Sequence, residues 1–128
     1  MKKQLDSVAD FYKAFNSPIG DKPQLIVKSR GKLRWELMNE ENLEYWQAVY
    51  DGDLIEVADA LGDMLYILCG TILEHGMQHK IDEVFEEIQR SNMSKLDENG
   101  LPIFREDGKI LKGKGYSEPN LSKILRTK

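Results

Sequence analysis

The sequence contains a single cysteine, Cys69, so the chain cannot form an internal disulfide. One cysteine and two histidines also supply too few sulfur and imidazole ligands for a structural zinc site. Cys69 lies in an apolar segment, and we expect it to be a small core residue rather than a nucleophile. This cysteine usage favours a reducing, cytoplasmic compartment.

Long hydrophobic runs are absent as well. The longest one, residues 64–73, is well short of the roughly 20 residues that a membrane-spanning helix needs. The first residues carry two lysines with no apolar segment behind them, so we expect no signal peptide. We therefore expect a soluble protein that has no membrane partner.

Positive charge does not dominate either, because 22 acidic residues outnumber 18 basic ones and give a net charge of −4. A protein that binds polymeric nucleic acid needs a basic surface to neutralise phosphates. The charge balance therefore disfavours that class of partner.

The chain does have the size and composition of one folded domain. Its 128 residues, 41% of them hydrophobic, can bury a core without a disulfide, so we expect a single domain over residues 1–128. Apolar residues that recur with helical spacing predict helices over residues 7–15, 25–50 (with a break allowed at Gly31), 54–74 and 80–91. The expected fold class is all-α: an antiparallel helical bundle of four to five helices with a short C-terminal hairpin or irregular tail.

The third of these helices carries a long apolar stripe of helical period, so we expect it to be packed. Asp53 should cap this helix, and Gly76 should follow its end. Its stripe is Leu54, Val57, Ala58, Leu61, Leu65, Leu68 and Ile72, and the expected apolar contacts of the second helix are Leu33, Leu37, Leu43 and Val49. The stripe on the third helix exceeds what a 128-residue monomer would bury, so we expect a homodimer or larger assembly.

The last third of the chain is rich in turn residues. Asp107-Gly108 is the type of dipeptide that a tight hairpin turn prefers. A basic, glycine-rich segment follows at residues 112–116, and Ser117 is placed to cap a short helix over residues 119–125.

Acidic residues gather on the two central helices. The second helix carries Glu36, Glu40, Glu41 and Glu44, and the third carries Glu56, Asp59 and Asp63. The link Asp51-Gly52-Asp53 is short enough to make these helices antiparallel neighbours, so their acidic faces can converge. Converging carboxylates repel one another unless cations neutralise them, and oxygen ligands suit Mg²⁺ or Mn²⁺. The alternative is that these acids are simply solvated helix faces.

The order of these acids matches a known pattern. Glu40-Glu41-Asn42-Leu43-Glu44, followed after eleven residues by Glu56-Val57-Ala58-Asp59, resembles the E-x-x-E and E-x-x-D signature of the MazG-like, all-α nucleoside triphosphate pyrophosphohydrolases. Residues 90–95 and 112–116 resemble the branch that includes phosphoribosyl-ATP pyrophosphohydrolase-like proteins and dUTPase relatives. The resemblance extends from about Phe11 to Leu121.

This resemblance implies an activity and a metal site. It implies a dimer or tetramer that hydrolyses an NTP or dNTP, such as dUTP or a non-canonical nucleotide, to the monophosphate and pyrophosphate, with Mg²⁺ or Mn²⁺ as cofactor. The implied metal ligands are Glu41, Glu44, Glu56 and Asp59. Glu40 would be the catalytic base or a further ligand, and Asp63 a supporting or alternative ligand.

Basic and polar residues downstream are candidate substrate contacts. Lys95, Lys112 and Lys114 can pair with phosphates, and the adjacent glycines allow backbone N–H groups to approach. A mobile, solvated loop is the alternative for these lysines. The remaining candidates for the sugar or base are Asn92, Tyr116 and, by the resemblance, Asn16. Asn92 can equally cap a helix, and Tyr116 can equally pack in a core.

Two other functions fit the same sequence. One keeps the fold and changes the substrate to phosphoribosyl-ATP. The other is a non-catalytic helical module for homo-oligomerisation or interaction, whose acids bind a partner or only solvate the protein.

Overall fold

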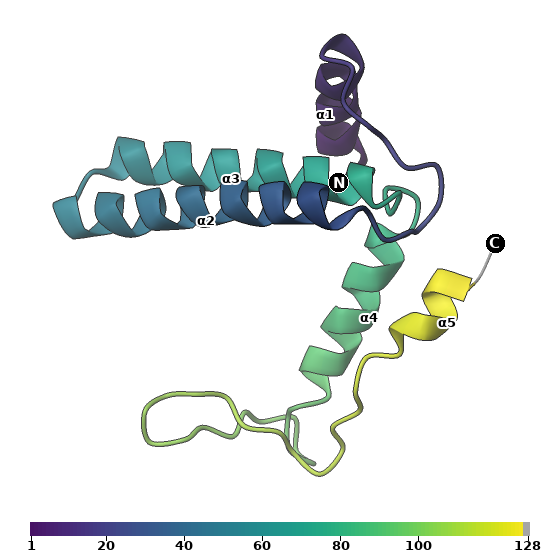
Figure 1. Cartoon of the computed structure of the whole chain (residues 1–128). Coiled ribbons are helices and arrows are strands. Elements are labelled where there is room, and N and C mark those ends of the chain that lie inside the picture. Colours follow the sequence, from purple (N-terminus) through teal and green to yellow (C-terminus); the bar gives the residue numbers. More distant parts are fainter. Residues whose placement is uncertain (127–128) are drawn as a thin grey trace. The chain divides into compact units, whose positions relative to one another are not determined.

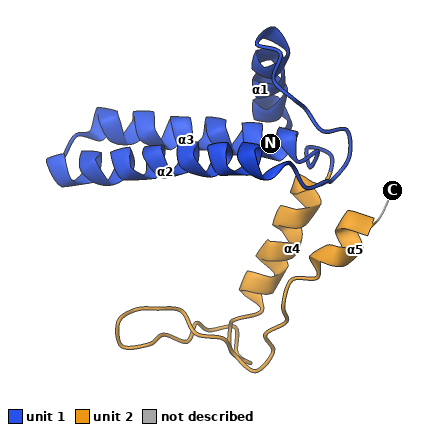
Figure 2. Cartoon of the chain, viewed as in Figure 1, with its two compact units in different colours: residues 1–79 blue, residues 80–128 orange. Residues whose placement is uncertain are grey.

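The computed structural model describes residues 1–126, and this part of the chain contains five helices and no strand (Figure 1). The helices are α1 (Lys2–Ala14), α2 (Lys28–Asp51), α3 (Leu54–Glu74), α4 (Ile81–Met93) and α5 (Leu121–Arg126). The all-α class is confirmed. The helices are distributed over two compact units, of which the second begins at Lys80 (Figure 2). Within the described residues, no helix combines the length and the apolar character needed to cross a membrane.

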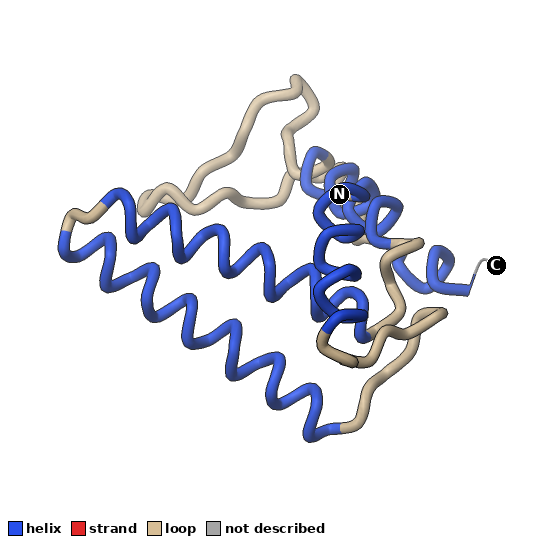
Figure 3. Tube along the Cα trace, turned by 90° about the horizontal axis from the view of Figure 1, so that it is seen from above, coloured by secondary structure: helices blue, strands red, loops and turns tan. Residues whose placement is uncertain are grey.

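The first unit is built on the antiparallel pair α2 and α3, which lie close together at their short link and spread apart away from it (Figures 1 and 3). Gly52 adopts a left-handed conformation, with φ of 67°, in the tight link between the two helices. Asp53 then caps α3, because its side chain accepts the backbone N–H of Glu56 at 3.1 Å. The predicted limits and cap of this helix are confirmed. The predicted preceding helix begins at Lys28 rather than Leu25, and α2 continues through Gly31 without a break.

Helix α1 packs against α3 and begins earlier than predicted, at Lys2 instead of residue 7. Leu5, Val8 and Tyr12 recur on one face of α1 and are buried, so this face supplies much of the apolar core of the unit. The ring of Phe11 meets Tyr66 of α3 edge-on, with the centroids 5.7 Å apart.

The loop between α1 and α2 crosses the C-terminal end of α3. The backbone N–H of Gly20 donates to Leu73 O at 2.8 Å, and that of Gln24 donates to His75 O at 2.9 Å. Gly76 has φ of +65°, and a Cβ at this position would lie 2.0 Å from the carbonyl oxygen of Lys22. Gly76 therefore ends α3, as the sequence predicts, and it also leaves room for the crossing loop.

Few of the apolar residues predicted as packing contacts on α2 and α3 are buried within the single chain. On α2 the buried residues are Arg34 and Ala48, with Glu41 half-buried between them. Most of the predicted apolar contacts are exposed instead: Leu33, Leu43 and Val49 on α2, and Leu54, Ala58, Leu61, Leu65 and Leu68 on α3. Helical spacing identifies an apolar face, but it does not say whether that face packs inside the chain or outside it.

The second unit joins α4 to α5 through polar contacts. Glu87 accepts Arg90 Nε at 2.7 Å and the backbone N–H of Asn120 at 2.7 Å. Ser117 does not cap the last helix as predicted, because α5 begins only at Leu121. Asn120 directly precedes the helix, and its Oδ1 lies 3.5 Å from Lys123 N. The predicted hairpin is reduced to one antiparallel bridge, between Phe104 and Ile110.

We predict that Gly76→Ala destabilises the protein far more than Gly100→Ala. Both glycines have positive φ, which costs an alanine about 1–2 kcal/mol. Only Gly76 also meets backbone atoms, because nothing lies within 4 Å of a Cβ at Gly100. Urea unfolding of the two variants should therefore show a larger loss for Gly76→Ala, and equal losses would contradict this account of the loop crossing.

Candidate functional site

Glu41, at the middle of α2, is a half-buried carboxylate that faces α3 and other acidic side chains. Its Oε2 is buried and has no hydrogen-bond partner. Burial raises the pKa of Glu41 to about 7, and a hydrogen bond with Glu44 and the negative charges of Glu44, Asp63 and Asp59 raise it further in the same direction. Four carboxylates, two from each helix, therefore act on one another at the α2–α3 interface.

A buried carboxylate oxygen without a partner is unfavourable unless it takes up a proton or a cation. The raised pKa of Glu41 corresponds to the uptake of a proton. A divalent ion would be the alternative, because the neighbouring donors are all carboxylate oxygens, which suit hard cations such as Mg²⁺ and Mn²⁺. The residues present therefore fit such an ion.

The same acidic face opens into a hollow of about 440 Å³ towards the α2–α3 link. Glu44 and Asp59 line it together with Glu56, so these two residues belong both to the group around Glu41 and to the hollow. The remaining lining residues are Gln47, Ala48, Asp51 and Asp53. Gln47 donates to both carboxylate oxygens of Asp51, at 3.0 and 3.1 Å. None of these lining residues is basic, so no positive side chain offsets the acids in this hollow.

The predicted residues are thus brought together in two overlapping sets. Glu41, Glu44, Asp59 and Asp63 interact directly, whereas Glu56 reaches the cluster only through the hollow it shares with Glu44 and Asp59. The motif made Asp63 a supporting or alternative ligand. Its charge nevertheless raises the pKa of Glu41, whereas that of Glu56 is not among the causes. The reason is geometric: Asp59 and Asp63 are four residues apart and share one face of α3.

Glu40 is placed differently from the other acids. It is exposed, it does not line the hollow, and it is not among the carboxylates that raise the pKa of Glu41. Among residues 1–126, no three carboxylate, histidine or cysteine side chains are already close enough to form a complete metal cage. Ligation would therefore require side-chain rotation at the α2–α3 interface.

The predicted phosphate-binding segment is attached to the end of α4. The N–H of Gly113 donates to the carbonyl oxygen of Lys95 at 2.8 Å, and a Cβ at Gly113 would lie 2.5 Å from Leu96 O. The ammonium of Lys112 lies over the ring of Tyr116, 4.5 Å from its centroid. This segment is therefore ordered by backbone contacts rather than solvated throughout.

Two of the polar candidates border a separate hollow in the second unit. Asn92 and Lys95 line a space of about 380 Å³ with the apolar residues Met93, Leu96, Pro102 and Ile110. Lys114 is exposed. Asn16, in the first unit, has φ of 54° and follows the end of α1, which is a helix-terminating role. A contact between any of these residues and a substrate stays a prediction.

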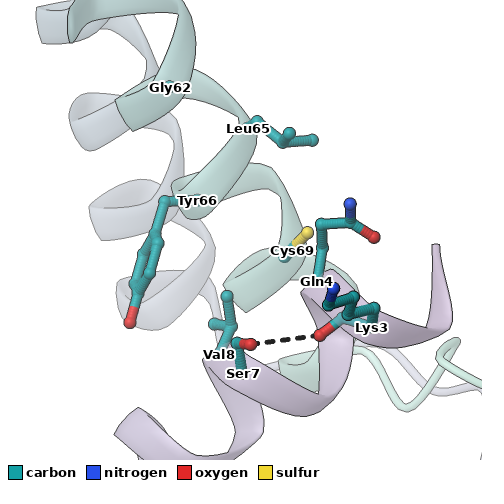
Figure 4. Close-up of a pocket in the computed structure, with 8 residues that line it drawn as sticks. All are labelled: Lys3, Gln4, Ser7, Val8, Gly62, Leu65, Tyr66 and Cys69. Carbon is teal, nitrogen blue, oxygen red and sulfur yellow. Dashed lines mark hydrogen bonds between the residues drawn. The ribbon is translucent and has the colours of Figure 1, made fainter.

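A further pocket lies between α1 and α3 (Figure 4). It has a volume of about 310 Å³ and is lined by Lys3, Gln4, Ser7, Val8, Gly62, Leu65, Tyr66 and Cys69. No carboxylate borders it, so it is no metal site. Cys69 is fully buried, and burial raises the pKa of its thiol, which confirms the expectation of a core residue.

One polar cluster was not anticipated from the sequence. Glu74 at the end of α3 is buried, and its carboxylate accepts the hydroxyl of Tyr12 at 2.5 Å and Arg30 Nε at 3.0 Å. Burial and this hydrogen bond raise the pKa of Tyr12 above its usual value. An acid at the end of an apolar helix was the available signal, but its partners lie 44 and 62 residues away in the sequence.

Comparison with known proteins places this geometry in a family. A crystal structure of a "putative NTP pyrophosphohydrolase" from Exiguobacterium sp. 255-15 is 28% identical to this chain, covers 94% of this chain and 90% of its own, and superposes with a TM-score of 0.51. No curated protein matches the chain. Residues 8–92 match the model of the phosphoribosyl-ATP pyrophosphohydrolase family. That match takes in α2, α3 and all of the acidic residues discussed above, and the chain belongs to the phosphoribosyl-ATP pyrophosphohydrolase family.

Proposed function

We propose that the protein is a Mg²⁺-dependent nucleotide pyrophosphohydrolase that converts an NTP or dNTP to the monophosphate and pyrophosphate. The observation that carries the proposal is the buried, unpaired Oε2 of Glu41 among three further carboxylates on two facing helices. Membership of the family, and the likeness to the Exiguobacterium structure, support the same reaction class.

The metal ligands in this proposal are Glu41, Glu44, Asp59 and Asp63, with Glu56 contributing from the hollow that it shares with Glu44 and Asp59. A bound divalent ion would neutralise these acids and withdraw charge from the phosphates of the substrate. The four carboxylates around Glu41 would hold the ion in a defined place, since two of them come from each of two helices. Mn²⁺ prefers similar oxygen ligands and should substitute for Mg²⁺.

The base that activates water is proposed to be Glu40, next to Glu41 in the sequence. Glu40 is exposed, so its carboxylate is accessible to the solvent water that a base would activate, although it lies outside the group around Glu41. The lysines at 95, 112 and 114 remain candidates for phosphate contacts, and Asn16, Asn92 and Tyr116 for the base or sugar.

The name of the matching family favours phosphoribosyl-ATP as a second candidate substrate. The reaction at the phosphates is of the same class for both substrates, so the acidic cluster serves either. A non-catalytic interaction module is the remaining alternative, and it would need neither the metal nor the hollow.

We also propose that the outer face of the α2–α3 pair is covered by a second copy of the chain, as a homodimer or homotetramer. Leu54, Ile55 and Trp46 are 80%, 79% and 63% exposed. Exposed apolar residues in such number on neighbouring helices are typical of an interface, because soluble monomers seldom leave a large apolar patch in water.

The activity itself is tested with purified protein, Mg²⁺ and a panel of NTPs, dNTPs, dUTP and phosphoribosyl-ATP, with release of monophosphate and pyrophosphate as the readout. We predict that Glu44→Gln and Asp59→Asn each lower kcat/KM by about 100-fold or more, since even residues that only support metal ligands are worth about 10–100-fold. Glu36→Gln, on the same helix but outside the cluster, is the matched control. Wild-type turnover in both acidic variants would refute the metal site.

The charge state of Glu41 gives a pH prediction for metal-free protein in a chelator. The folded-state pKa, about 7, is raised above the usual 4.5, so the folded state binds more protons than the unfolded state between these values. The contribution of Glu41 to stability is therefore fully present below pH 4.5 and is lost as the pH rises through about 7.

We accordingly expect the melting temperature in chelator to fall between pH 5 and pH 8, and Mg²⁺ at pH 8 to raise it again. Glu41→Gln should flatten the fall, because glutamine does not ionise. The matched control is Glu40→Gln, which changes a neighbouring but exposed acid. A pH profile of Glu41→Gln that is identical to wild type would contradict the assignment.

The assembly is tested by sedimentation. Wild-type protein should sediment at twice or four times the chain mass of 14.8 kDa, and Ile55→Glu should shift it towards the monomer. Leu101→Glu is the control, because Leu101 is also exposed but lies in the C-terminal tail. A wild-type species of 14.8 kDa at micromolar concentration would rule the proposal out.

A further inference from the structure

The polar cluster around Glu74 ties together the three helices of the first unit. The side chain of Glu74 is 1% exposed, and both of its oxygens have partners. Oε1 accepts Arg30, whose Nη2 lies at 2.9 Å, and Oε2 accepts Tyr12 at 2.5 Å and faces Arg34 Nη1 at 3.4 Å. A buried carboxylate so fully paired is held in one position.

Arg34 extends this cluster along α3. Its Nε donates to Thr71 Oγ1 at 3.1 Å, and its Nη2 donates to the carbonyl oxygen of Ile67 at 3.0 Å. With Glu74, the guanidinium thus contacts three positions that span about two turns of α3. Because the guanidinium is planar and its donors are fixed, only one axial position of α2 along α3 satisfies all three contacts.

Gly70 makes this position accessible. It lies between Thr71 and Ile67 on the side of α3 that Arg34 crosses, and a Cβ there would be 2.8 Å from Arg34 Nη2 and 2.6 Å from the hydroxyl of Tyr12. Only glycine at position 70 leaves room for the Tyr12 hydroxyl and the Arg34 guanidinium, so the close approach of Arg34 to α3 depends on this glycine. Arg34 is 8% exposed, so the contact is shielded from water.

The acidic cluster lies farther along the same two facing stripes. Glu41 follows Arg34 by seven residues, which is about two turns of α2, and Asp63 precedes Ile67 by four residues on α3. In an antiparallel pair, fixing Arg34 against Ile67, Thr71 and Glu74 also fixes Glu41 against Asp63.

Little else in the interface would define this alignment. The buried apolar residues on the facing stripes are the small Ala48 and Ala60, which offer no deep interlocking. A slip of one helical turn moves a residue by about 5.4 Å. Oxygen ligands of one Mg²⁺ lie about 2.1 Å from the ion, so a slip of that size would separate carboxylates that must converge.

We propose that Arg34 is a positioning residue, which holds α2 and α3 in the axial register that brings Glu41 and Glu44 opposite Asp63 and Asp59. This inference rests on the proposed function, because it assigns to Arg34 the alignment of the metal ligands. Its contacts with Ile67, Thr71 and Glu74 act on the site through the helices and not by touching substrate.

The first measurement is Mn²⁺ binding to the full chain, by electron paramagnetic resonance, at a temperature where each variant is folded. Arg34→Lys keeps the positive charge beside Glu74 but loses the planar set of donors, and Thr71→Val removes one contact with little change of shape. We expect Arg34→Lys to weaken Mn²⁺ binding about 10-fold or more and Thr71→Val to weaken it less. Leu5→Ala, which removes buried packing between α1 and α3, should change it less than two-fold.

The second measurement reports the register directly. Nitroxide labels at Asn39→Cys on α2 and Gly62→Cys on α3, in a Cys69→Ala background and diluted with unlabelled protein, give the distance between the helices. Both label sites are exposed. We expect Arg34→Lys to shift or broaden this distance on the scale of one turn, about 5.4 Å, and Leu5→Ala to leave it unchanged.

These two measurements separate the possible failures. Unchanged distances in Arg34→Lys would overturn the register role, and so would a loss of Mn²⁺ binding of equal size in Leu5→Ala. If wild-type protein bound no Mn²⁺, the proposed function would fail, while the distance between the labels would still decide whether Arg34 sets the register.

Discussion

The packing of α2 against α3 depends on charged groups at an interface where most helix pairs bury apolar side chains. The facing stripe of α2 runs from Arg34 through Glu41 to Ala48, and that of α3 runs from Glu74 through Asp63 to Ala60. A charge at such a place is unfavourable unless it is paired. The two ends of the pair meet this requirement in different ways, and much of the remaining structure follows from the difference.

At one end the pairing is complete within the chain. Glu74 is matched by Arg30 and Arg34 and by the hydroxyl of Tyr12, so α1 is tied to the same cluster. The loop between α1 and α2 crosses α3 just beyond this point, where Gly76 allows its close approach. The other end has acids but no arginine, and Glu41 is left with a buried oxygen that no group in the described chain satisfies.

The features that could be predicted from the sequence are those with local causes. Asp53 caps α3 through a neighbour three residues away, and Gly76 ends it through its own backbone conformation, so both limits of this helix were predictable. The presence of acids on two consecutive helices, and a short link between them, likewise predicted that the acids would converge.

The features that could not be predicted depend on contacts between distant residues. Leu33 and Leu43 were predicted as apolar contacts of α2, yet both are exposed, because Arg34 pairs with groups 33 to 40 residues later and so determines which side of α2 meets α3. The same rotation explains the site. Spacing within the motif favoured Glu56 with Asp59, whereas the rotation of α3 that puts Glu74 under Arg34 also turns Asp63 towards Glu41.

The exposed apolar residues and the converging acids are therefore two consequences of the same orientation of α2 and α3. If the leucines and tryptophans packed between α2 and α3, the carboxylates would point to solvent, and they would repel one another only weakly. With the observed rotation, the carboxylates are held close together in a partly buried place, where they would bind a cation more strongly than in open solvent, and the apolar residues stay exposed within the single chain. The proposed metal site between these two helices and the proposed assembly outside them would therefore require the same orientation of α2 and α3, which the buried pair of Arg34 and Glu74 stabilises.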